Sequence, residues 1–225
     1  ITHSLIVLPL WALLVSVFFA LLLGQKKRWL AYYPYALAGL VIHVLGDLVT
    51  TYGTMILSPF SNTRFEWGTT FIFDFWLSGI VVAGLLFSLL WRTSRLPAVV
   101  ALAALAGYVG FQAMLKERAI EAGQVHARTH GLGDVTVNAL PQAFSPFRWM
   151  VIIKGTERYW YAHINVLHHE PPPVSEQASG WLARYSGAFQ SIDRAVWQQV
   201  RQFGADEAEA ALSRRIFHEP RFGFY

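Results

Sequence analysis

Four long apolar segments, separated by short polar stretches, occupy the first half of the chain. They cover residues 4–24, 30–54, 69–91 and 97–114. A helix needs about 20 predominantly apolar residues to cross the hydrocarbon core of a bilayer. The pattern therefore predicts about four transmembrane helices in a bundle. The last of them is rich in Ala and Gly, which favours close helix packing.

The second half of the chain has the pattern of a small domain exposed to water. Stretches rich in Val, Ile, Tyr and Trp predict strands over residues 134–139, 147–154 and 158–167. The sequence Lys154-Gly155-Thr156-Glu157 predicts a hairpin turn between the last two strands. From residue 175 to residue 217, apolar side chains recur at spacings of three and four, which predicts a helix.

These elements define the expected fold class and its division into domains. We expect a mostly α membrane protein, with a transmembrane helical domain over residues 1–115. A small α+β extramembrane domain over residues 116–225 follows it. The composition agrees, because hydrophobic residues make up 54% of the chain and charged residues only 14%. Soluble domains carry about 25% charged residues, so we expect the lipid bilayer itself to be a partner.

Charge and cysteine content narrow the classes of partner and site. The formal net charge of +4 lies partly in short loops between the predicted spans, so we expect no nucleic acid partner. The chain has no cysteine, which excludes disulfides and thiolate ligands. It begins at Ile1 rather than at a methionine, and we therefore expect the natural N-terminus to lie upstream.

Two basic loops predict the orientation of the spans. Residues 25–28 follow the first span with the sequence Gln-Lys-Lys-Arg, and residues 92–95 follow the third with Arg-Thr-Ser-Arg. Both loops lie on the same side of the membrane in a four-span protein. The positive-inside rule makes that side cytoplasmic. We therefore expect a multi-pass protein whose loop 55–68 and C-terminal domain lie on the outer face.

His43 and Asp47 are the most unusual polar residues of the predicted spans. Ionisable groups at membrane depth are costly and are rarely without a function. A spacing of four places both side chains on one face of a helix, with Asp47 roughly 10 Å below the end of its predicted span. Imidazole and carboxylate groups are ligands for Zn²⁺ and other divalent metals. His3 and Asp74 would lie in the same outer half of the membrane, which predicts a shared metal site.

Simpler roles for these residues remain open. His43 could be a hydrogen-bonded packing residue, and Asp47 could bond to Thr50 or Thr51. Asp74 could cap a helix or pair with Arg64. The Arg64 guanidinium could be an ordinary loop charge, although a guanidinium beside the site would suit a phosphate oxyanion.

A second histidine pair, His126 and His130, also has the spacing of helical metal ligands. Gly131 and Gly133 follow it closely. We interpret this pair as surface residues.

Several spaced motifs resemble a known family, and together they span most of residues 1–167. They are Thr2-His3-Ser4, His43-x-x-x-Asp47-x-x-Thr50-Thr51-Tyr52-Gly53-Thr54, Pro59-Phe60-Ser61-x-x-Arg64, Phe71-Ile72-x-Asp74 and Leu140-Pro141-x-x-x-Ser145-Pro146-Phe147-x-Trp149. This set resembles the membrane-bound metal-dependent hydrolases of the prokaryotic inner membrane, including the LexA-regulated ones. The His43-x-x-Gly46-Asp47 core is also distantly similar to the metal-binding helix of zinc-dependent phospholipases C.

The resemblance implies an integral membrane hydrolase in the prokaryotic inner (plasma) membrane. A divalent metal, expected to be Zn²⁺, would be held by His3, His43, Asp47 and Asp74 and would activate a water molecule. The water would attack a phosphoester or another ester of an amphiphilic, lipid-like or lipid-linked substrate. The expected catalytic residues are Asp47 and Asp74, either of which could be ligand or general base, and Arg64, which would hold the substrate anion.

Two hypotheses from other classes remain. In an ion- or proton-coupled transporter, His43, Asp47 and Asp74 would relay protons or hold a cation. The sequence shows no inverted repeat and no pair of broken helices, which counts against this hypothesis. In a non-catalytic membrane scaffold, the outer domain would bind a partner.

Overall fold

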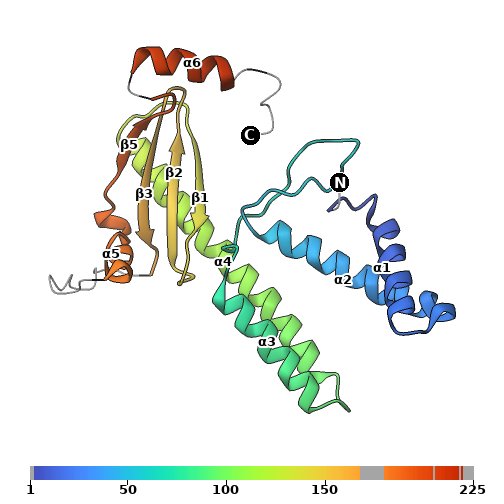
Figure 1. The fold of residues 1–225 in the computed structure, drawn as a ribbon. Coiled ribbons are helices and arrows are strands. Elements are labelled where there is room, and N and C mark those ends of the chain that lie inside the picture. Colours follow the sequence, from blue (N-terminus) through green and yellow to red (C-terminus); the bar gives the residue numbers. More distant parts are fainter. Residues whose placement is uncertain (1–2, 168–179, 205, 218, 220–225) are drawn as a thin grey trace. The chain divides into compact units, whose positions relative to one another are not determined.

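A computed structural model describes residues 3–167, 180–204, 206–217 and 219 of the chain (Figure 1). The chain divides into two compact units, Ile1–Gly68 and Thr69–Tyr225. Each unit is built around a hairpin of two apolar helices, and the second unit also carries a β-sheet.

The first unit is the hairpin of α1 (Leu8–Leu22) and α2 (Trp29–Val49), joined through the short 3-10 turn η1 (Lys26–Arg28). Small side chains line the contact face of α1 at a spacing of four, and Ala12, Ser16 and Ala20 are fully buried there. Small residues at this spacing allow two helices to approach closely. The basic residues of the first loop lie in η1, which is the closed end of this hairpin.

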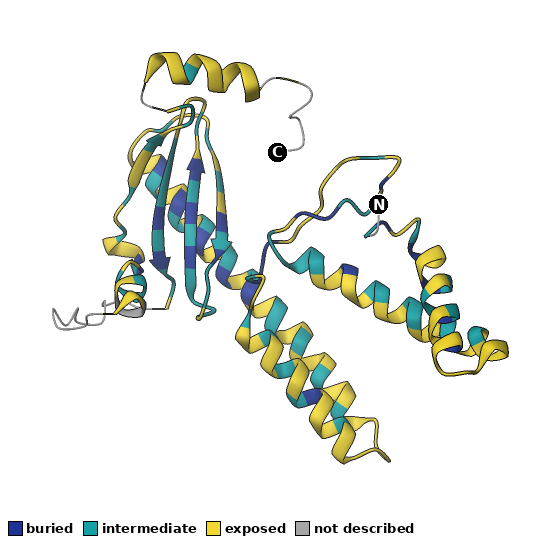
Figure 2. Cartoon of the chain, in the orientation of Figure 1, coloured by how far each residue is buried: buried dark blue, intermediate teal, exposed yellow. Residues whose placement is uncertain are grey.

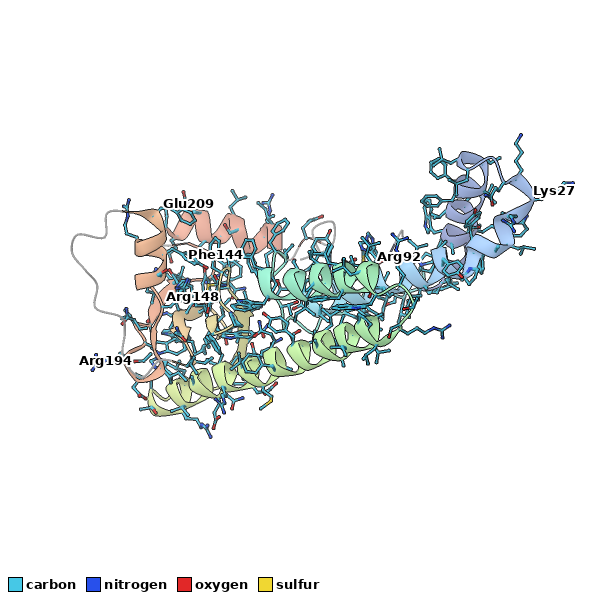
Figure 3. The ribbon with its side chains drawn as sticks, turned by 90° about the horizontal axis from the view of Figure 1, so that it is seen from below. Lys27, Arg92, Phe144, Arg148, Arg194 and Glu209 are labelled. Atoms are coloured by element: carbon cyan, nitrogen blue, oxygen red, sulfur yellow. The ribbon has the colours of Figure 1, made fainter. Side chains whose placement is uncertain are left out.

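The second hairpin consists of α3 (Phe75–Leu90) and α4 (Leu96–Thr129). Gly84 is buried against α4, and a Cβ atom at this position would lie 2.4 Å from the Cβ of Ala101. Glycine is therefore required by the close contact of the two helices. Arg92 lies in the turn at the closed end of this hairpin (Figure 3). Arg95 lies directly before the first residue of α4.

The outward sides of the four helices are apolar and exposed (Figure 2). Two helical segments, Lys26–Val49 and Leu96–Thr129, are long and apolar enough to cross a membrane. α1 has 15 residues and α3 has 16, which is fewer than the about 20 needed for a full crossing. Among the described residues there are thus two candidate spans, each packed against a shorter apolar helix, and a bundle of four transmembrane helices stays a prediction.

The helices are shorter than predicted at the ends distant from the basic loops. α2 ends at Val49 rather than at residue 54, because Thr50 is extended and Gly53 has a φ of +72°. A positive φ of this size interrupts a right-handed helix. α3 begins at Phe75 rather than at residue 69, because Asp74 caps its first turn.

The sheet of the second unit confirms the three predicted strands. β1 (Thr136–Pro141), β2 (Arg148–Lys154) and β3 (Arg158–Asn165) are antiparallel neighbours in that order. The far edge of β3 pairs with β5 (Gln198–Arg201) and, further along, with β4 (Gln190–Ser191). The predicted turn at residues 154–157 is also present, since the Gly155 N–H donates to the Arg158 carbonyl at 2.9 Å.

The C-terminal half of α4 covers one face of this sheet. Alternate β2 residues, Trp149, Val151 and Ile153, are fully buried, as period-two alternation requires. Their partners on α4 include Leu115 and Ala119. The predicted domain boundary at residue 115 therefore lies inside a helix that continues without a break from the apolar hairpin to the sheet.

The predicted helix over residues 175–217 is wrong in its middle part. The described residues form α5 (Trp181–Gly187), β4, the 3-10 turn η2 (Ile192–Arg194), β5 and α6 (Glu207–Phe217). Residues 175–179 lie outside the described part of the chain. Apolar residues that fitted a helical period are used by the sheet instead: Phe189 is buried and Val200 pairs with Tyr159.

Candidate metal centre

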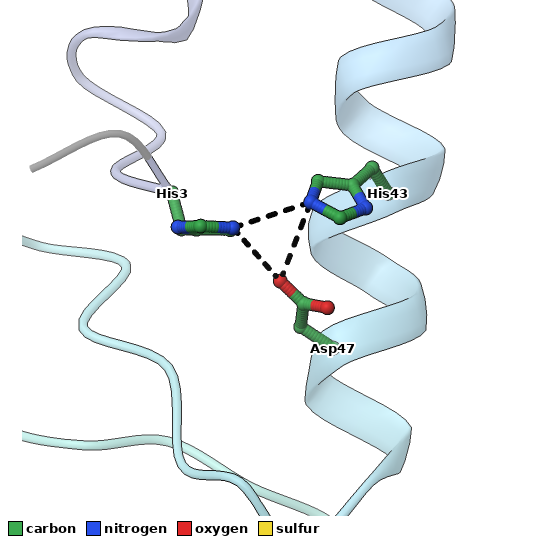
Figure 4. A group of neighbouring side chains, drawn as sticks. All are labelled: His3, His43 and Asp47. Atoms are coloured by element: carbon green, nitrogen blue, oxygen red, sulfur yellow. Dashed lines mark hydrogen bonds and ion pairs between the residues drawn. The ribbon is translucent and has the colours of Figure 1, made fainter. Parts of the chain in front are cut away.

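The last two turns of α2 carry His43 and Asp47 on the same face (Figure 4). Asp47 lies only two residues before the end of the helix, so about 3 Å of helix separates it from the loop. The predicted depth of roughly 10 Å was wrong, because it counted residues 50–54 as helix. The Asp47 side chain is 27% exposed and that of His43 59% exposed, so both are accessible from the end of the hairpin.

His3 reaches this face of α2 from a segment forty residues away in the sequence. Ser4, which is completely buried, anchors that segment: its hydroxyl donates to the Ser58 carbonyl. The next N–H, that of Leu5, donates to the Ile56 carbonyl at 3.0 Å. These bonds fasten the residues before α1 to the loop after α2 and turn His3 toward the two side chains on α2.

Three potential ligand atoms converge at this point. His3 Nε2 lies 3.2 Å from His43 Nε2 and 3.4 Å from Asp47 Oδ2, and His43 Nε2 lies 3.8 Å from the same oxygen. Zn²⁺ bonds to nitrogen and oxygen are about 2.0–2.2 Å long, which separates ligand atoms by about 3.3–3.6 Å at a tetrahedral centre. An octahedral centre with the same bonds would separate them by about 2.8–3.1 Å. Only the His3–Asp47 separation lies within the tetrahedral range, and the other two lie just below and just above it, so the three atoms are candidate ligands whose spacing does not define one coordination geometry.

Hydrogen bonding within this group requires one particular pair of histidine tautomers. A neutral imidazole donates through one nitrogen only, so the Nε2–Nε2 contact requires one ring to donate while the other accepts. Asp47 also lies at the C-terminal end of α2, where the helix dipole disfavours negative charge and favours a cation. In the described part of the chain, the ion partners of Asp47 are His3 and His43. A bound cation would satisfy all three ligand atoms at once and neutralise the carboxylate.

Two neighbouring residues, Thr50 and Arg64, bond to backbone carbonyls. Thr50 bonds to the backbone carbonyl of Asp47, at 2.8 Å from its hydroxyl and 3.1 Å from its N–H, rather than to the carboxylate. Arg64 lies in the loop after α2, exposed, and donates to the Gly53 carbonyl at 3.3 Å. A guanidinium has five N–H donors, so this single bond is compatible with the expected role in holding an anion.

Asp74 belongs to the second unit, where it has a complete set of partners. One carboxylate oxygen accepts from the N–H groups of Trp76 and Leu77 at 2.9 Å each, and the other accepts from the Tyr108 hydroxyl at 2.8 Å. Asp74 is therefore the N-cap of α3, one of the simpler roles considered from sequence. Its place among the metal ligands stays a prediction. Three donors on one carboxylate make a general-base role less favourable for Asp74 than for Asp47.

Two groups of supporting residues were not predicted from the sequence. Tyr108 and Gln112 extend from α4 to the Asp74 carboxylate, and the Gln112 amide donates to the Tyr108 hydroxyl at 3.3 Å. Polar residues four apart in an apolar span were the signal that singled out His43 and Asp47, and the same signal was present here. The Ser4 anchor had no comparable signal, because its partners lie more than fifty residues away.

The second histidine pair has a packing role. His126 and His130 lie at the end of α4 with their rings stacked at 4.0 Å, and Trp197 stacks on the other face of His126 at 4.1 Å. Nδ1 of His130 lies 3.0 Å from the His126 carbonyl. His126 is thus held between two rings and packs against the segment that leads into β5.

Comparison with known proteins identifies the family of this chain. Searches against curated proteins and against solved structures gave no match. Residues 1–119, more than half of the chain, match the YdjM inner membrane protein family. The matched region contains His3, His43, Asp47, Arg64 and Asp74. This is a family of inner membrane proteins, in agreement with the apolar hairpins, and its description names no activity. The chain therefore belongs to the YdjM inner membrane protein family.

Proposed function

We propose that this protein is a metal-dependent hydrolase of the inner membrane that cleaves an ester, in particular a phosphoester, of a lipid-like substrate. One observation carries the proposal: two imidazole nitrogens and one carboxylate oxygen lie within 3.8 Å of one another at an accessible helix end. The three residues come from two separate segments, and a buried serine fixes the approach of one segment to the other.

His3, His43 and Asp47 would hold the metal, expected to be Zn²⁺. A divalent metal with three protein ligands supplies a polarised ester oxygen and a water of lowered pKa when it is bound. The carboxylate of Asp47 has a second oxygen, which can accept a proton from a nearby water or hydroxyl. Asp74 stays a predicted fourth ligand of this site.

The surroundings of the three ligands favour an amphiphilic substrate. The apolar outward faces of α1 and α2 are suited to acyl chains, whereas the His3 and His43 side chains are about half exposed at the end of the hairpin. A lipid whose head group reaches the ligands could therefore leave its chains in the bilayer. Arg64, on the loop that also anchors Ser4, supplies a positive charge for a phosphate oxyanion.

The experiment compares metal content and hydrolysis in three full-length variants. Asp47→Ala should lose both, because it removes a ligand and the adjacent acceptor. Arg64→Ala should keep its metal and lose activity toward phosphoesters through a higher KM. Asp134→Asn, an exposed carboxylate of the second unit, is the matched control and should retain both. Full hydrolysis by Asp47→Ala would contradict the proposal, and metal binding without turnover of any ester would favour the cation-coupled transporter.

A further inference from the structure

An exposed aromatic cluster lies where the sheet of the second unit meets the start of α3. The Phe144 ring, on the loop between β1 and β2, stacks on the Phe75 ring at 5.7 Å with an angle of 17° between the planes. Trp181 and Tyr185 of α5 lie against the other sides of Phe144, at 6.1 and 5.8 Å between centroids. Three separate segments of the chain thus contribute one ring or more to a single surface.

These rings remain open to the surroundings despite their mutual contacts. Phe75 is 61% exposed, Trp181 62% and Phe144 45%. Phe144 also has a φ of +70°, a left-handed conformation that a bulky residue other than glycine rarely adopts. Packing in the core cannot account for a strained backbone that presents a phenyl ring at the surface. A binding surface to which the Phe144 ring contributes can account for this conformation.

The position of Phe75 connects the cluster with the membrane. Phe75 is the first residue of α3, and α3 packs along α4, a candidate membrane-spanning helix. The cluster therefore lies at the level where the apolar hairpin begins. Trp and Tyr side chains gather at this level in membrane proteins, because the boundary between head groups and acyl chains accommodates both their rings and their polar atoms.

The two ends of the sheet differ in polarity, as expected if only the end with the aromatic cluster contacts the membrane. The turn between β2 and β3, at the end remote from Phe144, carries the polar residues Thr156 and Glu157. β2 has seven residues and is about 23 Å long at 3.3 Å per residue, so the turn is well separated from the cluster. At the aromatic end, Arg184 is exposed on α5 and adds a positive charge suited to anionic head groups.

We propose that Phe75, Phe144, Trp181 and Tyr185 form a lipid-docking surface. It inserts into the head-group region of the leaflet at which α3 begins and holds the sheet against that leaflet. The continuous helix α4 fixes the sheet at the correct height, and the aromatic cluster fixes its rotation about the helix axis. This inference is independent of the hydrolase proposal, since it requires only that the α3–α4 hairpin enters the membrane.

The absence of cysteine from the sequence allows a direct test with single nitroxide labels. A label at Ala188→Cys, at the exposed C-cap position of α5, seven residues after Trp181 and three after Tyr185, reports on the cluster. A label at Thr156→Cys, in the remote turn, is the matched control. Both are placed in full-length protein in nanodiscs of phosphatidylethanolamine and phosphatidylglycerol. At 188 we expect frequent collisions with oxygen and few with a water-soluble nickel chelate, and at 156 the reverse.

Removal of the rings should abolish this difference without unfolding the sheet. Phe144→Gly deletes the ring and also relieves the positive φ, so it should not destabilise the loop. Combined with Trp181→Gln, it should raise nickel-chelate collisions at 188 to the level at 156. Equal nickel-chelate access at 188 and 156 in the unsubstituted background would overturn the proposal. So would a label at 188 that is shielded from oxygen as well, because protein rather than lipid would then cover the surface.

Discussion

At the residue scale, the candidate metal centre depends on one buried serine. His43 and Asp47 need only the local geometry of a helix to meet, which is why a spacing of four predicted their pairing. His3 has no such local constraint, and its approach depends on the Ser4 contacts with the loop after α2. Those contacts join residues more than fifty positions apart, so no local pattern in the sequence could predict them. The expectation for His3 came chiefly from the family resemblance.

Ser4→Ala should weaken metal binding while leaving all three ligands in place. The substitution removes the hydroxyl bond to the Ser58 carbonyl, and a hydrogen bond of this kind contributes about 1 kcal/mol. The expected loss in metal affinity is therefore about fivefold, measured by calorimetric titration of the metal-free protein. Ser61→Ala is the control, because Ser61 bonds within the same loop to Thr63. An unchanged affinity in Ser4→Ala would show that His3 is positioned by other contacts.

At the element scale, the long helix α4 explains the largest difference between expectation and structure. The predicted span ended at residue 114 because the charges of Lys116, Glu117 and Arg118 interrupt the apolar pattern. The helix continues because Ala119, Gly123 and Ala127 form a face of small residues against the sheet. Strands with strong alternation were predicted correctly. The short strands β4 and β5 were not, because only pairing with β3 makes residues 190–191 and 198–201 extended.

Gly123 gives a sharp test of the contact between α4 and the sheet. A Cβ atom there would lie 2.6 Å from Val137 Cγ1 and 2.7 Å from Val151 Cγ1, and neither methyl group can move away freely. Gly123→Ala should therefore lower the free energy of unfolding by about 1–3 kcal/mol. Gly107→Ala, in the same helix with open space around it, should not destabilise the protein, because alanine favours helix. Thermal unfolding in detergent measures both, and equal effects would contradict the packing account.

His163 on β3 should make the stability of the sheet domain depend on pH. Burial lowers the pKa of the His163 imidazole below its usual value of 6.5. Below pH 6.5 the unfolded chain therefore takes up a proton that the folded chain resists. The stability that the neutral His163 imidazole contributes is present above pH 6.5 and is lost as the pH falls. Thermal unfolding between pH 7.5 and 5.5 should show a smaller loss of stability in His163→Gln than in the unsubstituted protein. Equal losses of stability in the two proteins would show that His163 does not cause the pH dependence.

At the scale of the whole molecule, an inner-membrane protein is built from two apolar hairpins whose closed ends carry the basic residues. This pattern predicts that residues 25–28 and 92–95 face the cytoplasm and that the sheet domain lies outside. In intact cells, a membrane-impermeant maleimide should label Thr156→Cys and should not label Lys27→Cys or Ser94→Cys. The unsubstituted chain, which has no cysteine, gives the background. The reverse pattern of labelling would show that the topology is the inverse of the one predicted.

The central claim is that His3, His43 and Asp47 form a metal centre, and X-ray absorption spectroscopy of the purified full-length protein tests it most directly. We predict one bound divalent metal per chain, coordinated by two imidazoles and at least one carboxylate oxygen, with bonds of about 2.0–2.2 Å. In His43→Ala, one imidazole contribution should be lost together with most of the metal. A protein that binds no stoichiometric metal, or whose metal keeps both imidazoles in His43→Ala, would contradict the account.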